Sequence, residues 1–200
     1  MDEGSGPTVV DSSVSGNDGT LVNAPQWTQG FLGQALLFGG TRSVSVADAP
    51  SLNFGTGDFS LSAWVRSNAT GSHQAIINKG AYSLYKRNTG LLSFYTPGCG
   101  IIVSAGDVTP SVWHHTMVKR LGSTVSLYLD GQLAGTGSCT DNLSNGMALV
   151  LGCVAPGCAE PFDGVIDDVM ITKAGEPDPL NDFCAAQALA GSDLSGTDCL

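Results

Sequence analysis

The segment Phe59-Ser60-Leu61-Ser62-Ala63-Trp64-Val65 alternates between two kinds of side chain at every second position. One set is apolar and contains Phe59, Leu61, Ala63 and Val65; the other contains Ser60, Ser62 and Trp64. Successive residues of a β-strand point to opposite faces, so this period of two predicts a strand that buries one face. The same alternation recurs at residues 43–46 and 123–129, where Asp130-Gly131 predicts a tight hairpin turn into residues 132–134.

Further strands are predicted along the whole chain, with Gly, Asn, Asp or Pro between them. They cover residues 19–22, 34–38, 74–78, 82–86, 91–95, 113–119, 147–151 and 165–172. This recurrence is typical of an all-β, two-sheet antiparallel β-sandwich of the jelly-roll type. We expect a single domain over residues 1–200, with a core at residues 8–174. A tail at residues 175–200 is expected to hold a short helix at residues 179–190.

The composition excludes several classes of function. The 200 residues include 27 Gly, and only 13% are charged, which argues against a helical bundle. The net charge of −10 disfavours binding to nucleic acids or anionic membranes, and an apolar run of about 18 residues that could span a bilayer is missing. The first residues show no signal peptide and look like the start of an excised fragment, so we expect one module of a larger protein.

The six cysteines are expected to form three disulfides. Fifteen connectivities are possible, and the predicted one is Cys99–Cys139, Cys153–Cys158 and Cys184–Cys199. A zinc site is less probable from the spacing, because the cysteine pairs lack CxxC spacing and a neighbouring histidine. Disulfides indicate an oxidising compartment, so the chain is expected to be secreted or displayed at the cell surface.

Several segments, in their order and spacing, resemble a known family. They are residues 11–21 (DSSVSGNDGTL), 33–40 (GQALLFGG), 58–65 (DFSLSAWV), 113–118 (WHHTMV), 127–131 (LYLDG) and 162–169 (FDGVIDDV). Over residues 11–173 the chain resembles the laminin-G-like jelly rolls of the concanavalin A-like lectin/glucanase superfamily. It departs from them at Gly39, where the family has Asp, and after Asp168. The resemblance implies a module that binds glycans or proteins, and core positions for Trp64 and Trp113.

A calcium site is predicted at the first loop. Asp11, Asn17 and the Gly19 carbonyl supply hard oxygen ligands of the kind Ca²⁺ prefers, together with Ser15 and Asp18. The first and last strands of a sandwich often lie close together, so Asp168 is expected to complete the ligand set. The resemblance supports a structural calcium ion, because many family members tie this loop to the sheet with one. The alternative is an Asx-rich turn whose side chains bond their own backbone.

The sequence argues against catalysis. Asp167 and Asp168 are the closest carboxylates, but alternation predicts that Asp167 faces the core with Val169 while Asp168 faces outward, so they cannot flank one glycosidic bond. An inward Asp167 needs a partner, which could be a metal, a backbone amide or His115. His115 is expected to be a satisfied core residue, since a nucleophile beside it is not evident.

Ligand binding is predicted on the hairpin of residues 82–95. Tyr82, Tyr85, Arg87 and Tyr95 are the candidate ligand-binding residues, because exposed rings stack on sugars and Arg donates hydrogen bonds. The chain is therefore expected to be a non-catalytic extracellular binding module, for carbohydrate or for adhesion. One alternative is a structural or protein–protein interaction domain with a calcium staple, and another is a glycan-cleaving enzyme.

Overall fold

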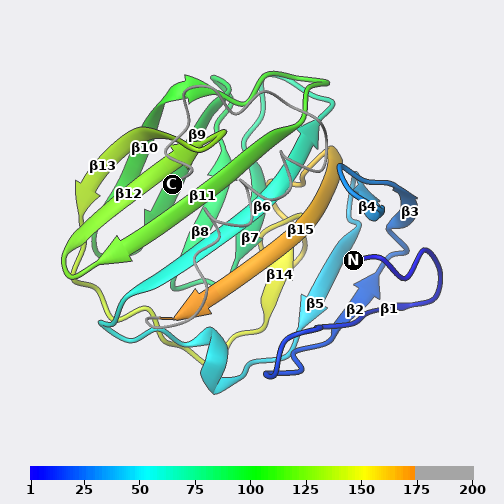
Figure 1. The fold of residues 1–200 in the computed structure, drawn as a ribbon, viewed down its shortest axis with the longest axis horizontal. Coiled ribbons are helices and arrows are strands. Elements are labelled where there is room, and N and C mark those ends of the chain that lie inside the picture. Colours follow the sequence, from blue (N-terminus) through cyan, green and yellow to red (C-terminus); the bar gives the residue numbers. More distant parts are fainter. Residues whose placement is uncertain (174–200) are drawn as a thin grey trace.

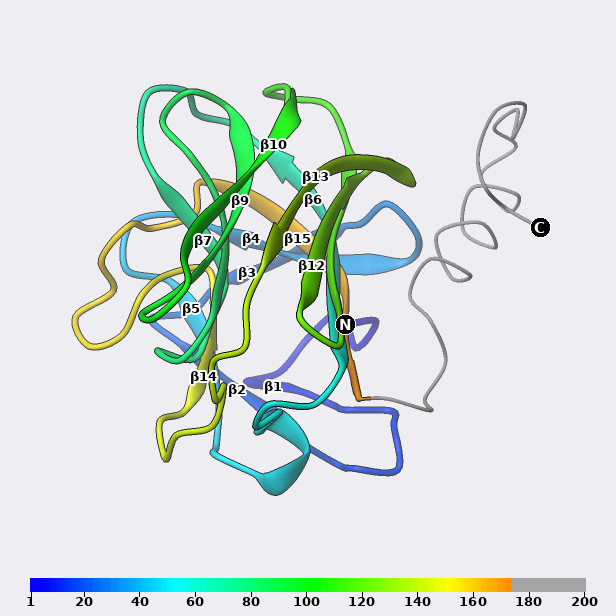
Figure 2. The same cartoon turned by 90° about the vertical axis from the view of Figure 1, so that its left-hand side faces the viewer.

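The computed structural model describes residues 1–173 and consists of two antiparallel β-sheets packed face to face (Figure 1). Figure 2 shows the layers from the side, with β7 and β9 in one sheet and β12 and β15 in the other. The predicted all-β sandwich is confirmed. The predicted helix at residues 179–190 and the predicted Cys184–Cys199 bridge lie outside the described residues. Within residues 1–173, no helix is long and apolar enough to cross a membrane.

The strands alternate between the sheets along the chain. The eight-stranded sheet runs in the order β1 (Thr8–Val9), β2 (Gly19–Val22), β5 (Ser43–Val46), β14 (Leu149–Leu151), β7 (Gln74–Asn78), β8 (Ser83–Lys86), β9 (Leu91–Thr96) and β10 (Gly100–Asp107). The seven-stranded sheet runs in the order β13 (Gln132–Ser138), β12 (Thr124–Leu129), β11 (His114–Leu121), β6 (Phe59–Ser67), β15 (Gly164–Lys173), β4 (Gln34–Phe38) and β3 (Gln26–Gln29). A short 3₁₀ helix, η1 (Pro50–Leu52), lies between β5 and β6.

The alternation in β6 places its side chains as predicted. Phe59, Leu61, Ala63 and Val65 all belong to the hydrophobic core between the sheets. Burying a Val, Leu or Phe side chain contributes about 1.5–3 kcal/mol, so the inner faces of the two sheets supply most of the stabilisation. Two phenylalanines stack there, with the ring centroids of Phe54 and Phe59 4.5 Å apart.

A β-bulge in β15 overturns the predicted orientation of Asp167. Asp167 pairs with Trp64, and Met170, three residues later, pairs with Ser62 on the same strand. The extra residue falls at Asp168 and Val169, and Asp168 has a positive φ of 41°. Asp167 therefore lies on the outer face of the seven-stranded sheet together with Trp64, and not in the core. A bulge shifts the alternation by one residue, which the sequence did not reveal.

Candidate functional site

The candidate ligand-binding residues lie on the outer face of the eight-stranded sheet, across β8, β9 and β10. Tyr85 pairs with Ser93, which pairs with Val103; Tyr95 pairs with Ser83 and with Ile101. The neighbouring residues Leu84, Phe94 and Ile102 point the other way, into the core. We call this outer surface the tyrosine face and define it as Ser83, Tyr85, Arg87, Ser93, Tyr95, Ile101 and Val103.

The prediction for Tyr82 is wrong, because this side chain is fully buried in the core. Its hydroxyl donates a hydrogen bond to the Leu52 carbonyl oxygen at 3.0 Å. Burial raises the pKa of Tyr82 above its ordinary value, and the charge of Asp48 adds to the effect. Tyr82 and Tyr85 are an odd number of residues apart, so an extended chain directs them to opposite faces.

The two tyrosines of the face differ in exposure. Tyr95 is 38% exposed, whereas Tyr85 is 7% exposed. Burial raises the pKa of Tyr85, and the nearby Arg87, which hydrogen-bonds the Tyr85 side chain, acts in the opposite direction. The face therefore offers one open ring beside a tyrosine whose position is fixed by an arginine.

Two buried polar atoms next to Tyr85 have no hydrogen-bond partner within residues 1–173. They are the Ser93 hydroxyl and Nδ1 of His73, whose ring centroid lies 6.0 Å from that of Tyr85. An unsatisfied buried donor or acceptor costs about 1–3 kcal/mol, so the site has unused hydrogen-bonding capacity. Neither residue was predicted. Ser93 could have been found from its spacing of two from Tyr95, whereas His73 comes from a loop whose position the sequence does not indicate.

The disulfide Cys153–Cys158 stiffens a loop at one border of the tyrosine face. The prediction of this pair is confirmed, with Cα atoms 5.0 Å apart. The segment between β14 and β15, yellow to orange in Figure 2, extends on the outer side of the eight-stranded sheet. Its Glu160 carbonyl oxygen accepts a hydrogen bond from the Ala75 amide at 2.9 Å, and the Glu160 charge acts on Tyr85. The loop thus brings an exposed carboxylate toward the face.

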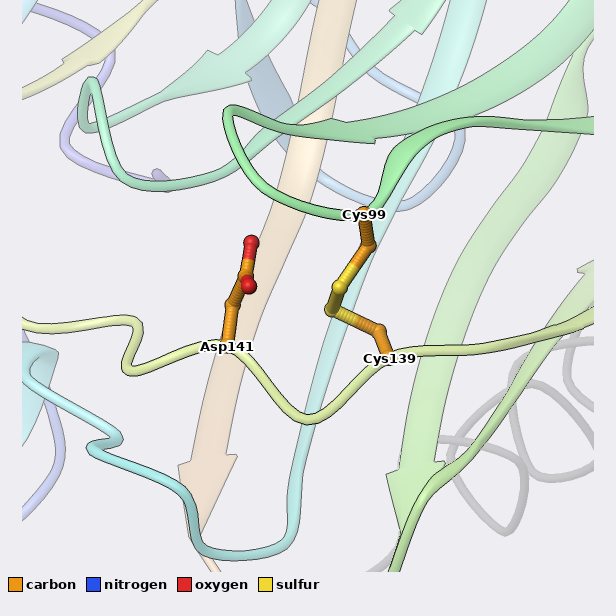
Figure 3. A group of neighbouring side chains, drawn as sticks. All are labelled: Cys99, Cys139 and Asp141. Atoms are coloured by element: carbon orange, nitrogen blue, oxygen red, sulfur yellow. A yellow bond between two sulfur atoms is a disulfide. The ribbon is translucent and has the colours of Figure 1, made fainter.

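The disulfide Cys99–Cys139 fixes the opposite border (Figure 3). It also was predicted, and it joins the turn before β10 to the segment after β13. Asp141 lies beside it and accepts hydrogen bonds from the Thr96 hydroxyl at 2.7 Å and the Gly98 amide at 2.8 Å. These three side chains are close enough for metal ligands, but the sulfur atoms are bonded to each other. The cluster is an anchor for the turn.

The first loop forms the Asx-rich turn that was the alternative to a calcium site. The two carboxylate oxygens of Asp11 accept the Ser13 amide at 2.9 Å and the Asn17 amide at 2.7 Å, and the Asp11 amide donates to Asp18 at 2.8 Å. Burial alone would raise the pKa of Asp11, but the hydrogen bonds from Asn17 and Ser13 outweigh it, and the pKa lies below its ordinary value. The loop is ordered by its own amides.

The structure does not bring Asp168 to this loop. β15 lies between β6 and β4, whereas Gly19 belongs to β2 in the other sheet. Lys173, at the end of β15, contacts Pro50 of η1, next to Ser51, which bonds the Asn17 side chain. Asp168 lies five residues before Lys173, about 16 Å along the strand at the usual rise. The expectation that the first and last strands meet was wrong, so the predicted four-residue ligand set does not assemble.

Calcium at this loop stays a prediction that rests on the Asp11 and Asp18 carboxylates. An ion that binds only the folded protein raises the free energy of unfolding, by about 2.7 kcal/mol at a concentration of 100 times Kd. We therefore expect a higher Tm in millimolar calcium than in EDTA, and loss of the difference in Asp11→Asn. Melting curves that coincide in the two buffers would remove calcium from the account.

Asp167 is sealed beneath the turn between β3 and β4. Its carboxylate accepts the Phe31 amide at 2.8 Å and the Leu32 amide at 3.3 Å, so a backbone amide is the partner it required. The Phe31 ring stacks on Trp64 with centroids 3.6 Å apart. Burial, with the charge of Asp168, raises the pKa of Asp167 to about 6, and burial lowers the pKa of His115 to about 4. The carboxylate is fully buried, and a glycan cannot reach it in this arrangement.

Comparison with known families agrees with this architecture. A laminin G family model, described as the concanavalin A-like lectin/glucanase superfamily, matches residues 38–175, more than half of the chain. The chain belongs to the concanavalin A-like lectin/glucanase superfamily. This superfamily member is matched by no curated protein sequence.

Solved structures share the fold of this superfamily member at low sequence identity. The binding domain of Paraclostridial Mosquitocidal Protein 1 has a TM-score of 0.66 and 16% identity, covering 91% of this chain and 50% of that one. Domain 4 of AbnA, a GH43 extracellular arabinanase from Geobacillus stearothermophilus in complex with arabinotriose, has a TM-score of 0.66 and 17% identity, covering 82% and 87%. The botulinum neurotoxin serotype D binding domain has a TM-score of 0.67 and 16% identity, covering 90% and 48%. The chain thus spans about half the length of the toxin binding-domain structures.

Proposed function

We propose that this protein is a non-catalytic carbohydrate-binding module and that the tyrosine face is its glycan site. The observation that carries the proposal is the grouping of the open Tyr95 ring, the Arg87-bonded Tyr85 and the unpartnered Ser93 hydroxyl on one surface. Sugars present apolar ring faces and many hydroxyls, so they bind to an exposed aromatic ring flanked by polar groups. The arabinanase domain in complex with arabinotriose supports this class of ligand and makes arabinotriose the first probe.

Replacing Tyr95 by alanine is expected to weaken glycan binding about tenfold. Burial of an aromatic side chain against a ligand contributes about 1.5–3 kcal/mol, and every 1.4 kcal/mol is a factor of ten in affinity. The measurement is isothermal titration with the best ligand from a glycan array, starting from arabinotriose. Tyr95 is 38% exposed on the sheet surface, so its truncation should leave the fold intact.

Tyr128→Ala is the matched control for Tyr95→Ala. Tyr128 is a half-buried tyrosine of β12, in the other sheet, and should leave the affinity unchanged. Equal affinities for the wild type and Tyr95→Ala would place glycan binding elsewhere on the domain. An array without any bound glycan would contradict the proposal itself.

The second candidate is a structural or protein–protein interaction domain. It is favoured by two apolar side chains of the outermost strand β10, because Ile101 is 47% exposed and Val103 is 38% exposed. Exposed apolar groups that lie together often mark a protein interface. The same array decides between the two candidates, since a protein ligand would leave it blank.

We further propose that the protein acts outside the cell as one module of a longer chain. Two disulfides among the described residues are typical of secreted and surface proteins. The toxin binding-domain structures, which are about twice as long as the matched region, are consistent with such a modular arrangement.

A further inference from the structure

Two fully buried lysines of the eight-stranded sheet and its β7–β8 turn differ in their hydrogen bonding. The Lys79 ammonium has acceptors on every side: Asp48 at 2.6 Å, the Met147 carbonyl at 2.9 Å, and both the carbonyl and side-chain oxygens of Asn145. The Lys86 ammonium donates to one acceptor within residues 1–173, the Ala69 carbonyl oxygen at 2.8 Å. An ammonium carries three N–H donors, so Lys86 keeps two of them unused.

A buried charge without full hydrogen bonding is costly, so the surroundings of Lys86 need an explanation. Lys86 lines a cavity of about 250 Å³ at one end of the sandwich, where the segments following β6, β8 and β10 meet. Its polar lining also includes Thr70, Asn88, Thr89, Asp107 and Thr109. The unused donors of Lys86 are thus beside an open space with polar walls.

The walls of this cavity are held in place by backbone hydrogen bonds. The Val108 amide donates to the Gly90 carbonyl oxygen at 2.9 Å and joins the segment after β10 to the β8–β9 hairpin. The Thr109 amide donates to Nε2 of His114 at 3.0 Å and ties the same segment to β11. The cavity is therefore preformed, which reduces the entropy lost when a ligand binds.

The chemistry of the lining selects a class of ligand. Lys86 and Asp107 carry opposite charges, and the remaining polar groups are hydroxyls and an amide, so the lining has no net charge and both donates and accepts. The residues that line it include no aromatic ring, which leaves hydrogen bonds as the means of recognition. Its volume is below the roughly 300 Å³ at which pockets for drug-sized ligands begin, so it suits a single small ring.

We propose that this cavity, the Lys86 pocket, binds one neutral, polyhydroxylated sugar unit. Lys86 donates to hydroxyl oxygens of the ligand, Asp107 accepts from its hydroxyl hydrogens, and the threonines complete the contacts. The pocket is distinct from the tyrosine face, because Lys86 lies on the opposite side of β8 from Tyr85 and Arg87. The proposal stands whether or not the tyrosine face binds a glycan.

The test is a titration of the whole chain with D-glucose, D-galactose and L-arabinose, and with D-glucuronic and D-galacturonic acid, followed by amide chemical shifts. We expect at least one neutral sugar to shift the amides of Gly90, Asp107 and Val108 with a millimolar Kd. Lys86→Met keeps the length of the side chain but removes its donors, and is expected to weaken binding at least about tenfold. Thr89→Val, at an exposed position that does not endanger folding, should weaken it several-fold.

The outcomes separate this pocket from the tyrosine face. Tyr95→Ala should leave the monosaccharide Kd unchanged, and a loss of binding there would move the site to the tyrosine face and overturn the proposal. Absence of shifts with every neutral sugar would mean that water alone fills the cavity. A preference for the uronic acids, or a Kd unchanged in both Lys86→Met and Thr89→Val, would refute the assigned ligand or its contacts.

Discussion

Replacing Arg120 by alanine is expected to lower the free energy of unfolding by about 3–5 kcal/mol, the range seen when a buried charged group loses its partners. The Arg120 side chain is fully buried at the end of β11. Its guanidinium donates to the carbonyl oxygens of Gly55 and Gly57 and to that of Asp141, each at 2.9 Å. It also lies 5.1 Å from the Phe59 ring centroid. Alanine would leave these carbonyls without donors and open a cavity.

Chemical denaturation at neutral pH measures this loss, and two variants control it. Arg120→Lys keeps a positive charge but cannot reach three carbonyls in a fixed plane, so an intermediate loss is expected. Arg42→Ala, at a half-exposed position of the β4–β5 turn, should change stability by no more than about 0.5 kcal/mol. If Arg120→Ala and Arg42→Ala cost the same, the buried guanidinium would not hold the segment of residues 55–57 to the sheet.

The stability of the wild-type protein is expected to vary little between pH 4 and 6.5 through two opposing groups near Trp64. The pKa of Asp167 rises from 3.8 to about 6 on folding, because burial and the charge of Asp168 favour its neutral form. Its contribution therefore grows as the pH falls through 6 toward 3.8. The pKa of His115 falls from 6.5 to about 4, because burial disfavours its charged form. Its contribution is lost as the pH falls through the same window.

Each of these shifts corresponds to about 3 kcal/mol at 1.36 kcal/mol per pKa unit, so removing either group should expose the other. Asp167→Asn is expected to lose about 3 kcal/mol between pH 6.5 and pH 4, because only the His115 effect remains. His115→Gln is expected to gain a similar amount over the same interval. Denaturant midpoints at several pH values measure both slopes. Parallel pH profiles for the two variants would show that these side chains do not take up and release the proton.

Alternation in the sequence was sufficient for the architecture and for most of the ligand-binding face. It placed Phe59, Leu61 and their neighbours in the core, and it put Tyr85, Arg87 and Tyr95 on the same side of a hairpin. Tyr82 was assigned to the wrong side although its odd spacing from Tyr85 was visible. The disulfides Cys99–Cys139 and Cys153–Cys158 were also predicted, because their cysteines occur in turns of suitable spacing.

Predictions that depended on the path of the chain fared less well. The bulge at Asp168 reversed the predicted orientation of Asp167, and the position of β15 inside the seven-stranded sheet separated Asp168 from the Asp11 loop. The sites around Lys86 and Ser93 were not predicted, since a buried lysine or serine cannot be recognised before its acceptors are known.

By itself, the sequence determined that this protein is an antiparallel sandwich and which side chains share a face of each hairpin. Both properties follow from a local period of two residues, which burial of one face enforces. Only the tertiary structure decided which charges have partners, which carboxylate is sealed and where a polar cavity opens. Those features depend on loops that are distant in the chain and meet at the ends and outer faces of the sheets, and no local pattern encodes that meeting.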